Sequence, residues 1–258
     1  MPAMHKTVSI RGLYFPKDFS PNDANAFGMH AMRESITRVV FTPNAEIAQM
    51  CVEDDSMRSL FNSADLLIPD GAGVVLASKI LGTPLKEKIA GISWAEGLFH
   101  AMQNDDNEEF RVFLLGGKPG IAEAAKEKLC ENYPRLQIVG THDGYFEKTG
   151  TENDAVIEKI NKSGAHVLFV CLGAPMQEKW IMANKDRMPN VCLMAGLGGS
   201  LDVWAGNVKR APRLFIKLNL EWFYRLTKEP RRIGRMLKLP KYILGTLREK
   251  RKNKHSKS

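Results

Sequence analysis

The chain has 258 residues, 44% of them apolar and 26% charged, a composition typical of globular proteins that excludes a wholly disordered chain. Its formal charge of +8 is spread unevenly: 17 basic and three acidic residues lie from Lys209 to Ser258, which leaves 20 basic and 26 acidic residues in the first 208. A mildly acidic body therefore carries a strongly cationic end, which favours a polyanionic partner such as lipid headgroups, nucleic acid or phosphate groups.

No segment is predicted to cross a membrane or to direct secretion. The longest uncharged stretch, Ser163 to Gln177, falls short of the roughly 20 apolar residues that a spanning helix needs. The first ten residues lack the apolar core of a signal peptide. The four cysteines are widely spaced without a CxxC pair, so we expect buried free thiols in a reducing cytoplasm.

The body alternates short apolar runs with helical patterns. In chain order, the sequence predicts a strand over 38–42, one or two helices over 45–62, a strand over 64–69, a helix over 73–81, a strand over 110–115, a helix over 121–133, a strand over 136–140, a helix over 153–163, a strand over 165–172, a helix over 175–187 and a strand over 191–195. Strands of this length that alternate with helices and leave through Gly or Pro indicate βαβ units and a parallel sheet.

Residue strings rich in Gly and Pro follow the predicted strands, where the binding crevice of an open parallel sheet lies. They are Thr42-Pro43-Asn44, Pro69-Asp70-Gly71, Gly116-Gly117, Gly173-Ala174-Pro175 and Gly196 to Ser200. Glycine there lets the backbone approach a ligand, and helix N-termini offer N–H groups to phosphate. Any one string has the alternative of a plain tight turn, but five in one chain favour a nucleotide or sugar-nucleotide crevice.

Several named motifs are absent from the sequence. Residues 116–120 lack the Walker A spacing and residues 196–201 do not form GxGxxG, which disfavours a P-loop NTPase and gives little support to an NAD enzyme. There is no HExxH, no DxD triplet and no Cys/His cluster with ligand spacing. We therefore expect no metal and no cofactor, and a transferase of the metal-dependent DxD type is disfavoured.

The cationic end is predicted to be a separate appendage, residues 209–258, on an α/β core of residues 1–208. Apolar residues at helical spacing form three segments: Leu214, Phe215, Leu218, Trp222, Phe223 and Leu226, then Ile233, Met236, Leu237 and Leu239, and after Pro240 Tyr242, Ile243, Leu244 and Leu247. Cationic amphipathic segments that carry aromatic residues are typical of interfacial membrane modules. Nucleic-acid binding and a core-packing helix with a frayed basic end are the alternatives. An apolar face left unburied would favour self-association into a homo-oligomer.

Three arginines of this appendage are seven and three residues apart, namely Arg225, Arg232 and Arg235. On a continuous helix they would share one face, although Pro230 between them would kink it. Such a trio is suited to clamp a diphosphate by charge-assisted hydrogen bonds.

Several strings taken together resemble the WecG/TagA/CpsF glycosyltransferase family, and most closely its TagA branch. They run in order from about residue 8 to 245 and comprise residues 42–46 (TPNAE), 69–75 (PDGAGVV), 90–91 (AG), 113–117 (FLLGG), 140–146 (GTHDGYF), 172–181 (LGAPMQEKWI), 198–202 (GGSLD), 205–206 (AG), 209–212 (KRAP), 220–226 (LEWFYRL) and 229–232 (EPRR). The match departs at Ser93, where the family commonly has Asp, and is loose from Leu13 to Asn25.

The resemblance implies an inverting, metal-independent glycosyltransferase with a Rossmann-like α/β body. Its expected partners are a UDP-sugar donor, a polyprenyl-diphosphate-linked acceptor and an anionic membrane surface, with the enzyme peripheral on the cytoplasmic face. The TagA branch moves N-acetylmannosamine from UDP-ManNAc to undecaprenyl-diphospho-GlcNAc, which commits it to wall teichoic acid. One alternative is another donor, UDP-ManNAcA or UDP-glucose, for other surface polysaccharides. The alternative from another class is a non-catalytic nucleotide- or nucleic-acid-binding α/β protein.

The resemblance also assigns roles by position. It implies Asp70 as the general base, Thr42 and Asn44 as residues of the sugar and acceptor pocket, and Gln177 as a donor-site residue. Tyr145 and Asp202 match positions near the uridine, and Arg225, Arg232 and Arg235 match catalytic tail arginines. The rest of the expected substrate-binding set is Gly71, Gly116, Gly117, Gly173, Ala174 and Pro175.

The residue types suit these roles. An inverting transfer needs a base for the acceptor hydroxyl proton, and Asp70 stands at a strand end, where a turn-capping Asp is the alternative. Without a metal, the leaving UDP needs another cation, which the tail arginines offer. Tyr145 is suited to stack on uracil, with a buried strand-end Tyr as the alternative.

Overall fold

The structure is a computed structural model and describes residues 6–106, 109–212, 215, 223–224, 234 and 237–255. At its centre is a six-stranded sheet in the order β4-β3-β8-β7-β5-β6, in which all neighbouring strands are parallel. The strands are β3 (Arg38–Phe41), β4 (Leu66–Leu67), β5 (Arg111–Gly116), β6 (Gln137–His142), β7 (Val167–Cys171) and β8 (Leu193–Gly196). Each overlaps one of the six predicted runs, so the expected parallel α/β sheet is confirmed.

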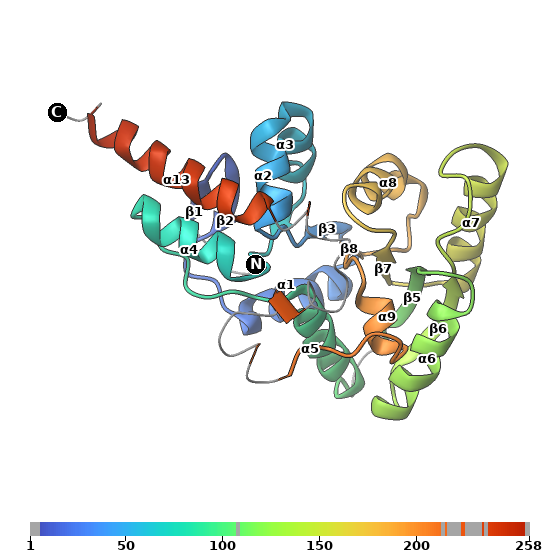
Figure 1. Cartoon of the computed structure of the whole chain (residues 1–258). Helices are drawn as coiled ribbons and strands as arrows, with labels where there is room; N and C mark the ends of the chain where they lie inside the picture. The colour runs from blue at the N-terminus through green and yellow to red at the C-terminus, as the bar shows by residue number, and fades with distance from the viewer. Residues whose placement is uncertain are drawn as a thin grey trace.

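Helices cover both faces of the sheet (Figure 1). One face carries α1 (Pro21–Arg33), α5 (Gly91–Gln103), α6 (Ile121–Asn132) and α9 (Ser200–Trp204). The other face carries α2 (Ala45–Glu53), α3 (Asp55–Asn62), α4 (Ala72–Leu81), α7 (Gly150–Ser163), α8 (Met176–Asn184), the 3-10 turn η1 (Lys185–Arg187) and α13 (Lys238–His255). The antiparallel hairpin of β1 (Thr7–Ile10) and β2 (Leu13–Pro16) packs on this second face.

Two apolar cores form because successive side chains of a strand point to opposite faces. In β5, Val112 and Leu114 enter the first core, and Phe113 and Leu115 enter the second. All five residues of β7 are buried, as expected of an inner parallel strand covered on both sides.

The sequence prediction missed the N-terminal hairpin and α1 and, further along the chain, α5 and α9. Yet α1 begins at a capping box, in which Ser20 and Asp23 each bond to the other's backbone N–H. Residues 45–62 form two helices because Asp54 serves both: its backbone N–H donates to the Met50 carbonyl, and its carboxylate caps the start of α3.

The described end of the cationic appendage is one helix, α13, which packs on α2 and α4. Pro240, predicted to separate two segments, lies in the first turn of this helix, where a missing N–H leaves no intrahelical bond unmade. Tyr242 is fully buried in the second core, so the core-packing alternative is correct for this residue, whereas Leu244 is 56% exposed. The boundary at residues 208 and 209 stays a prediction.

Polar contacts also fasten α13 to the body. The Arg11 guanidinium lies 5.8 Å from the centre of the Tyr242 ring and pairs with the Glu249 carboxylate at 2.9 Å. The Lys241 ammonium lies 2.5 Å from the Glu53 carboxylate on α2, and this hydrogen bond holds the pKa of Glu53 below its usual range. Among the helices that the structure describes, none is both long and apolar enough to span a bilayer.

All four cysteines are free thiols. Cys51, Cys171 and Cys192 are buried, as expected, and Cys130 is half-buried. Burial raises the pKa of Cys51 and of Cys171 to about 12, so both stay protonated at neutral pH.

Replacing Tyr242 with Ala should lower the free energy of unfolding by about 3–5 kcal/mol, because it empties a fully buried aromatic site between α13 and the body. Leu244→Ala on the exposed side of the same helix should change it by no more than about 0.5 kcal/mol. Urea unfolding followed by circular dichroism measures both. Equal losses in the two variants would contradict this packing of α13.

Candidate active site

The predicted strings meet along one edge of the sheet. Phe41 is level with both Leu67 and Gly196, Gly196 is level with Val170, and Gly116 is level with the next residue, Cys171, so the carboxyl ends of five strands lie within one residue of each other. The loops that follow them hold all the substrate-binding strings that the sequence predicted. The strands end at the same height because they are parallel and paired in this register.

At one end of this edge, Asp70 lies beside Asn44. The half-buried Asp70 follows β4, and its backbone N–H donates to the Pro43 carbonyl at 3.3 Å. The N-cap residue of α4 is Gly71, at φ +86°, and no side chain caps this helix, so Asp70 is not the helix cap. A β-carbon on Gly71 would lie 4.0 Å from the Asn44 β-carbon. The Asn44 Oδ1 accepts the Ile47 N–H as the N-cap of α2, and within the described ranges no hydrogen bond occupies its Nδ2.

Gly73 joins this end of the site to α13. A β-carbon there would lie 2.6 Å from the Ala45 β-carbon and 2.8 Å from the Leu239 Cδ1. The first turns of α2 and α4 and the start of α13 therefore meet at one point next to Asp70. Only glycine permits so close an approach.

Thr42 links the end of β3 to the end of β8. Its hydroxyl donates to the Gly196 carbonyl at 3.2 Å, and the residue is 8% exposed. A β-carbon on Gly91, the first residue of α5, would lie 3.1 Å from the Thr42 side chain. Thr42, which directly follows β3, is therefore held against the end of β8 and the start of α5.

Gln177 binds the loop after β8 from the other side. Its Oε1 accepts the Gly198 N–H at 3.0 Å, and its Nε2 donates to the Glu178 Oε1 at 2.8 Å. Its own N–H donates to the Gly173 carbonyl at 3.0 Å, which ties the start of α8 to the predicted Gly173-Ala174-Pro175 turn. The side chain of Gln177 is buried and faces the backbone of the site.

Glu178 was not among the predicted site residues. It is 1% exposed, and among the described residues its Oε2 has no hydrogen-bond partner. Burial raises the pKa of Glu178 to about 6. Nothing in the sequence pattern indicates this burial, because a Glu between Gln177 and Lys179 on a helix has the pattern of a surface charge.

Together with short stretches of main chain, these hydrogen bonds connect Glu178 and Gln177 to the loop after β8, and that loop to Thr42; the last link is from the Pro43 carbonyl to the backbone N–H of Asp70. The structure thus brings together the predicted base, the predicted pocket Thr and the predicted donor-site Gln. We call the series the cross-edge chain; it consists of Glu178, Gln177, Gly198, Gly196, Thr42, Pro43 and Asp70.

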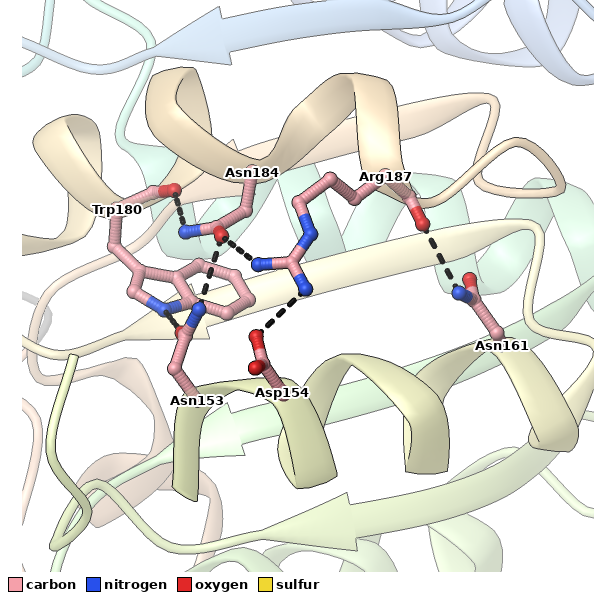
Figure 2. A network of polar contacts seen from close by, with 6 residues as sticks. All are labelled: Asn153, Asp154, Asn161, Trp180, Asn184 and Arg187. Atoms are coloured by element: carbon pink, nitrogen blue, oxygen red, sulfur yellow. Dashed lines mark hydrogen bonds and ion pairs between the residues drawn. The ribbon is translucent and has the colours of Figure 1, made fainter. Parts of the chain in front are cut away.

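A polar network fixes the helix that carries Gln177 and Glu178 (Figure 2). The Trp180 indole N–H donates to the Asn153 Oδ1 at 2.7 Å, and the Asn153 amide donates to the Asn184 Oδ1 at 3.1 Å. In η1, which follows α8, Arg187 pairs with Asp154 at 2.7 Å. Because Asn153 and Asp154 belong to α7, the network holds α8 on α7 rather than forming a site.

The other end of the edge presents bare backbone. Gly116 has φ +132°, and a β-carbon there would lie 2.4 Å from the Cys171 carbonyl oxygen, so no other residue fits. Gly117, at φ +74°, accepts the Gly144 N–H at 2.8 Å. Strand ends without side chains let a ligand lie close to the main chain.

Tyr145 and Asp202 lie toward this end. Tyr145 follows β6, and at 68% exposed it is not the buried strand-end Tyr of the alternative interpretation. Its N–H donates to the Asp143 carboxylate at 2.7 Å. Asp202 is half-buried in the first turn of α9 and raises the pKa of Cys171 in addition to burial. Four strands separate the loop of Tyr145 from that of Asp70, so these two side chains do not meet.

A small pocket adjoins the Asp70 end. It has a volume of about 170 Å³ and is lined by Pro21, Lys88, Ile89, Ala90, Ser93, Trp94 and Arg210. The Arg210 guanidinium donates to the Ser93 hydroxyl at 2.6 Å and lies 3.4 Å from the Glu96 carboxylate. Ser93 therefore contacts Arg210 without neutralising its charge, which only the Glu96 carboxylate offsets among the described residues.

The predicted tail arginines, Arg225, Arg232 and Arg235, lie outside the described residues. In the ranges that the structure does describe, no group of three His, Cys, Asp or Glu side chains is arranged to hold a metal ion.

Comparison with known proteins gives consistent matches. The model of the glycosyl transferase WecG/TagA/CpsF family matches residues 13–256. The chain is similar to a Bacillus subtilis protein (37% identity, covering 87% of this chain and 85% of the relative) and to one from Bacillus spizizenii (35%, covering 91% and 90%). A Staphylococcus aureus protein is 36% identical over 84% of this chain and 83% of its own. All three are named N-acetylglucosaminyldiphosphoundecaprenol N-acetyl-beta-D-mannosaminyltransferase.

Glu178→Gln should change how stability depends on pH. Because the folded-state pKa of about 6 exceeds the ordinary 4.5, the folded protein binds this proton more tightly than the unfolded chain. Below pH 4.5 the Glu178 carboxyl is protonated in both states and carries no charge to bury. Above pH 6 it is ionised, and the burial of its charge lowers the free energy of unfolding by about 2 kcal/mol.

The free energy of unfolding of the Gln variant minus that of wild type should accordingly rise by about 2 kcal/mol between pH 4 and pH 7.5. Urea unfolding at each pH measures it. Glu158→Gln, at a 63% exposed side chain on α7, is the matched control and should show no such rise. A pH-independent difference for Glu178→Gln would contradict the raised pKa.

Proposed function

We propose, from the premise that the chain belongs to the WecG/TagA/CpsF family of glycosyltransferases, that it transfers N-acetylmannosamine from UDP-ManNAc to undecaprenyl-diphospho-GlcNAc in wall teichoic acid synthesis. The observation that carries the proposal is that relatives named for this transfer share 35–37% identity with the chain over more than four-fifths of both proteins. A non-catalytic binding protein, the alternative from another class, has no support in this family.

Asp70 is the proposed general base. As an acceptor hydroxyl attacks the anomeric carbon of the donor, a new C–O bond forms, the bond to the diphosphate breaks with its electrons going to UDP, and the Asp70 carboxylate takes the hydroxyl proton. The half-buried position beside Asn44 supports this role, because the Asn44 Nδ2, which has no partner among the described residues, can donate to a sugar oxygen. The Thr42 hydroxyl donates to the Gly196 carbonyl, and this bond holds the loop of Thr42 and Asn44 in place.

The donor is proposed to lie along the rest of the edge. Gln177 and the turn of Gly173, Ala174 and Pro175 stand nearest the cross-edge chain, and the space beside Gly173 is open. Gly116 and Gly117 follow beyond it as main chain without side chains. The exposed ring of Tyr145 is suited to stack on uracil, with Asp202 toward the same end. Near Asp70, Lys88 and Arg210 bring positive charge to a pocket that a phosphate group fits.

We further propose that the protein binds peripherally to the inner face of the cell membrane. Leu244 and Leu247 on α13 are exposed, as is Leu237 just before its start, and the helix carries Lys and Arg residues along its length. Apolar residues beside basic ones suit an anionic bilayer, where each cation contributes about 1 kcal/mol. Such a surface would bring the site to a lipid-linked acceptor.

A donor panel tests the proposed function. With a lipid-diphospho-GlcNAc acceptor in vesicles, UDP-ManNAc should exceed UDP-ManNAcA and UDP-glucose in kcat/KM by about tenfold or more. Turnover should be faster in anionic than in zwitterionic vesicles at equal acceptor density. A higher kcat/KM with another UDP-sugar would contradict UDP-ManNAc as the donor. Equal rates in the two kinds of vesicle would contradict the proposed membrane role of α13.

Asp70→Asn should lower the transfer rate by about 10²–10⁴-fold, because the amide cannot accept the acceptor proton, while UDP binding by calorimetry stays as in wild type. Asp55→Asn, an exposed carboxylate at the start of α3, is the control and should retain full activity. An Asp70→Asn enzyme with wild-type turnover would remove Asp70 as the base.

A further inference from the structure

We propose that Glu178 is a positioning residue of the donor site: its carboxylate holds the Gln177 amide in one orientation, and that amide fixes the loop after β8. The role in catalysis rests on the proposed function, but the positioning itself does not. Four observations support it.

The first is the chemistry of the two contacts that Gln177 makes. The Gly198 N–H can only donate, so the side-chain oxygen of Gln177 must face it, at 3.0 Å. An ionised carboxylate can only accept, so the side-chain NH₂ of Gln177 must face Glu178, at 2.8 Å. A flipped amide would place donor against donor and acceptor against acceptor. The two partners therefore select the same orientation.

The second observation is the tight packing of this amide on the backbone. A β-carbon on Gly196 would lie 2.7 Å from the Gln177 Nε2, so the amide rests directly on the main chain at residue 196. The carbonyl of Gly196 accepts the Thr42 hydroxyl. A change in the orientation of Gln177 is thus transmitted to Gly198 on one side and to Thr42 on the other.

The third observation is that the position of Glu178 is costly. The carboxylate is almost fully buried, and within the described part of the chain one of its oxygens has no hydrogen-bond partner. A neutral or apolar side chain of similar size would avoid this cost, since replacing buried charges with apolar groups is often neutral or stabilising. Stability alone therefore does not account for a carboxylate here.

The fourth observation is that the supporting helix is fixed independently. The network of Asn153, Trp180 and Asn184 holds α8 on α7 without any contribution from Glu178 (Figure 2). Removing the carboxylate should consequently leave α8 in place and free only the Gln177 amide.

Two substitutions separate positioning from stability. Glu178→Gln keeps the size and a weaker acceptor, and Glu178→Leu removes the acceptor. We expect exchange of the Gly198 amide hydrogen to accelerate in the order Glu, Gln, Leu, and KM for the UDP-sugar to rise by about tenfold to 100-fold in the Leu variant with a smaller change in kcat. Thermal stability should not follow that order. Glu158→Gln is the control for all three readouts.

A double-mutant cycle with Gln177→Ala tests whether Glu178 acts through Gln177. In the Gln177→Ala background, Glu178→Leu should have no further effect on KM. Additive effects, unchanged Gly198 exchange in both Glu178 variants, or activity losses that parallel losses of stability would each overturn the proposal. If the Leu variant does not fold, the Gln variant decides by the same criteria.

The exchange measurement also separates this proposal from the proposed function. If wild type turns over none of the UDP-sugars, the assigned reaction fails, yet faster Gly198 exchange in Glu178→Leu would still establish the positioning. If wild type is active and exchange is unchanged, the positioning fails and the reaction stands.

Discussion

The hydrogen bond from the Thr42 hydroxyl to the Gly196 carbonyl crosses the boundary between two parts of the sheet. Strands β4 and β3 come from the first part of the chain, and β8, β7, β5 and β6 from the second, so β3 and β8 are the seam at which the two meet. Asp70 and Asn44 lie on one side of this seam, and Gln177 on the other. The site depends on the two sides ending at the same level, which the parallel register of β3 and β8 provides.

The residues at the seam explain why particular side chains are required there. Gly196 must lack a side chain because the Gln177 amide lies against its backbone. Thr42 is both short enough to fit against Gly91 and able to donate to Gly196. The ionised Glu178 carboxylate accepts from the Gln177 NH₂ and cannot donate to the Gln177 oxygen, so it disfavours the flipped amide. Only the Thr42–Gly196 bond crosses the seam; the contacts of Gln177 with Gly196 and Glu178 fix the loop after β8 on its own side.

Much of the fold could be predicted from the sequence because buried parallel strands are apolar over their whole length, as in Val167–Cys171. The start of α1 carried a readable signal in Ser20 and Asp23, but α5 has no side-chain cap and begins at a glycine, so its pattern was not recognised. For the site, glycines and Asp70 after strands were informative, since topology alone brings strand ends together. The sequence was not informative about burial that depends on distant packing. Glu178 has the pattern of a surface charge, and only the packing of α8 on α7 buries it. The apolar stripe of Tyr242 has the same pattern whether it faces lipid or α2.

The meeting of α2, α4 and α13 at Gly73 has a geometric consequence. Leu239, in the first turn of α13, lies against the turn of α4 that directly follows Asp70, and the outer side of the same helix exposes Leu244. The carboxylate and the outward leucines thus belong to one packed unit rather than being joined by a flexible tether. Whatever plane α13 rests on, the height of Asp70 above that plane is set by helix packing, and a substrate rising from the plane would have to meet the carboxylate at that fixed height.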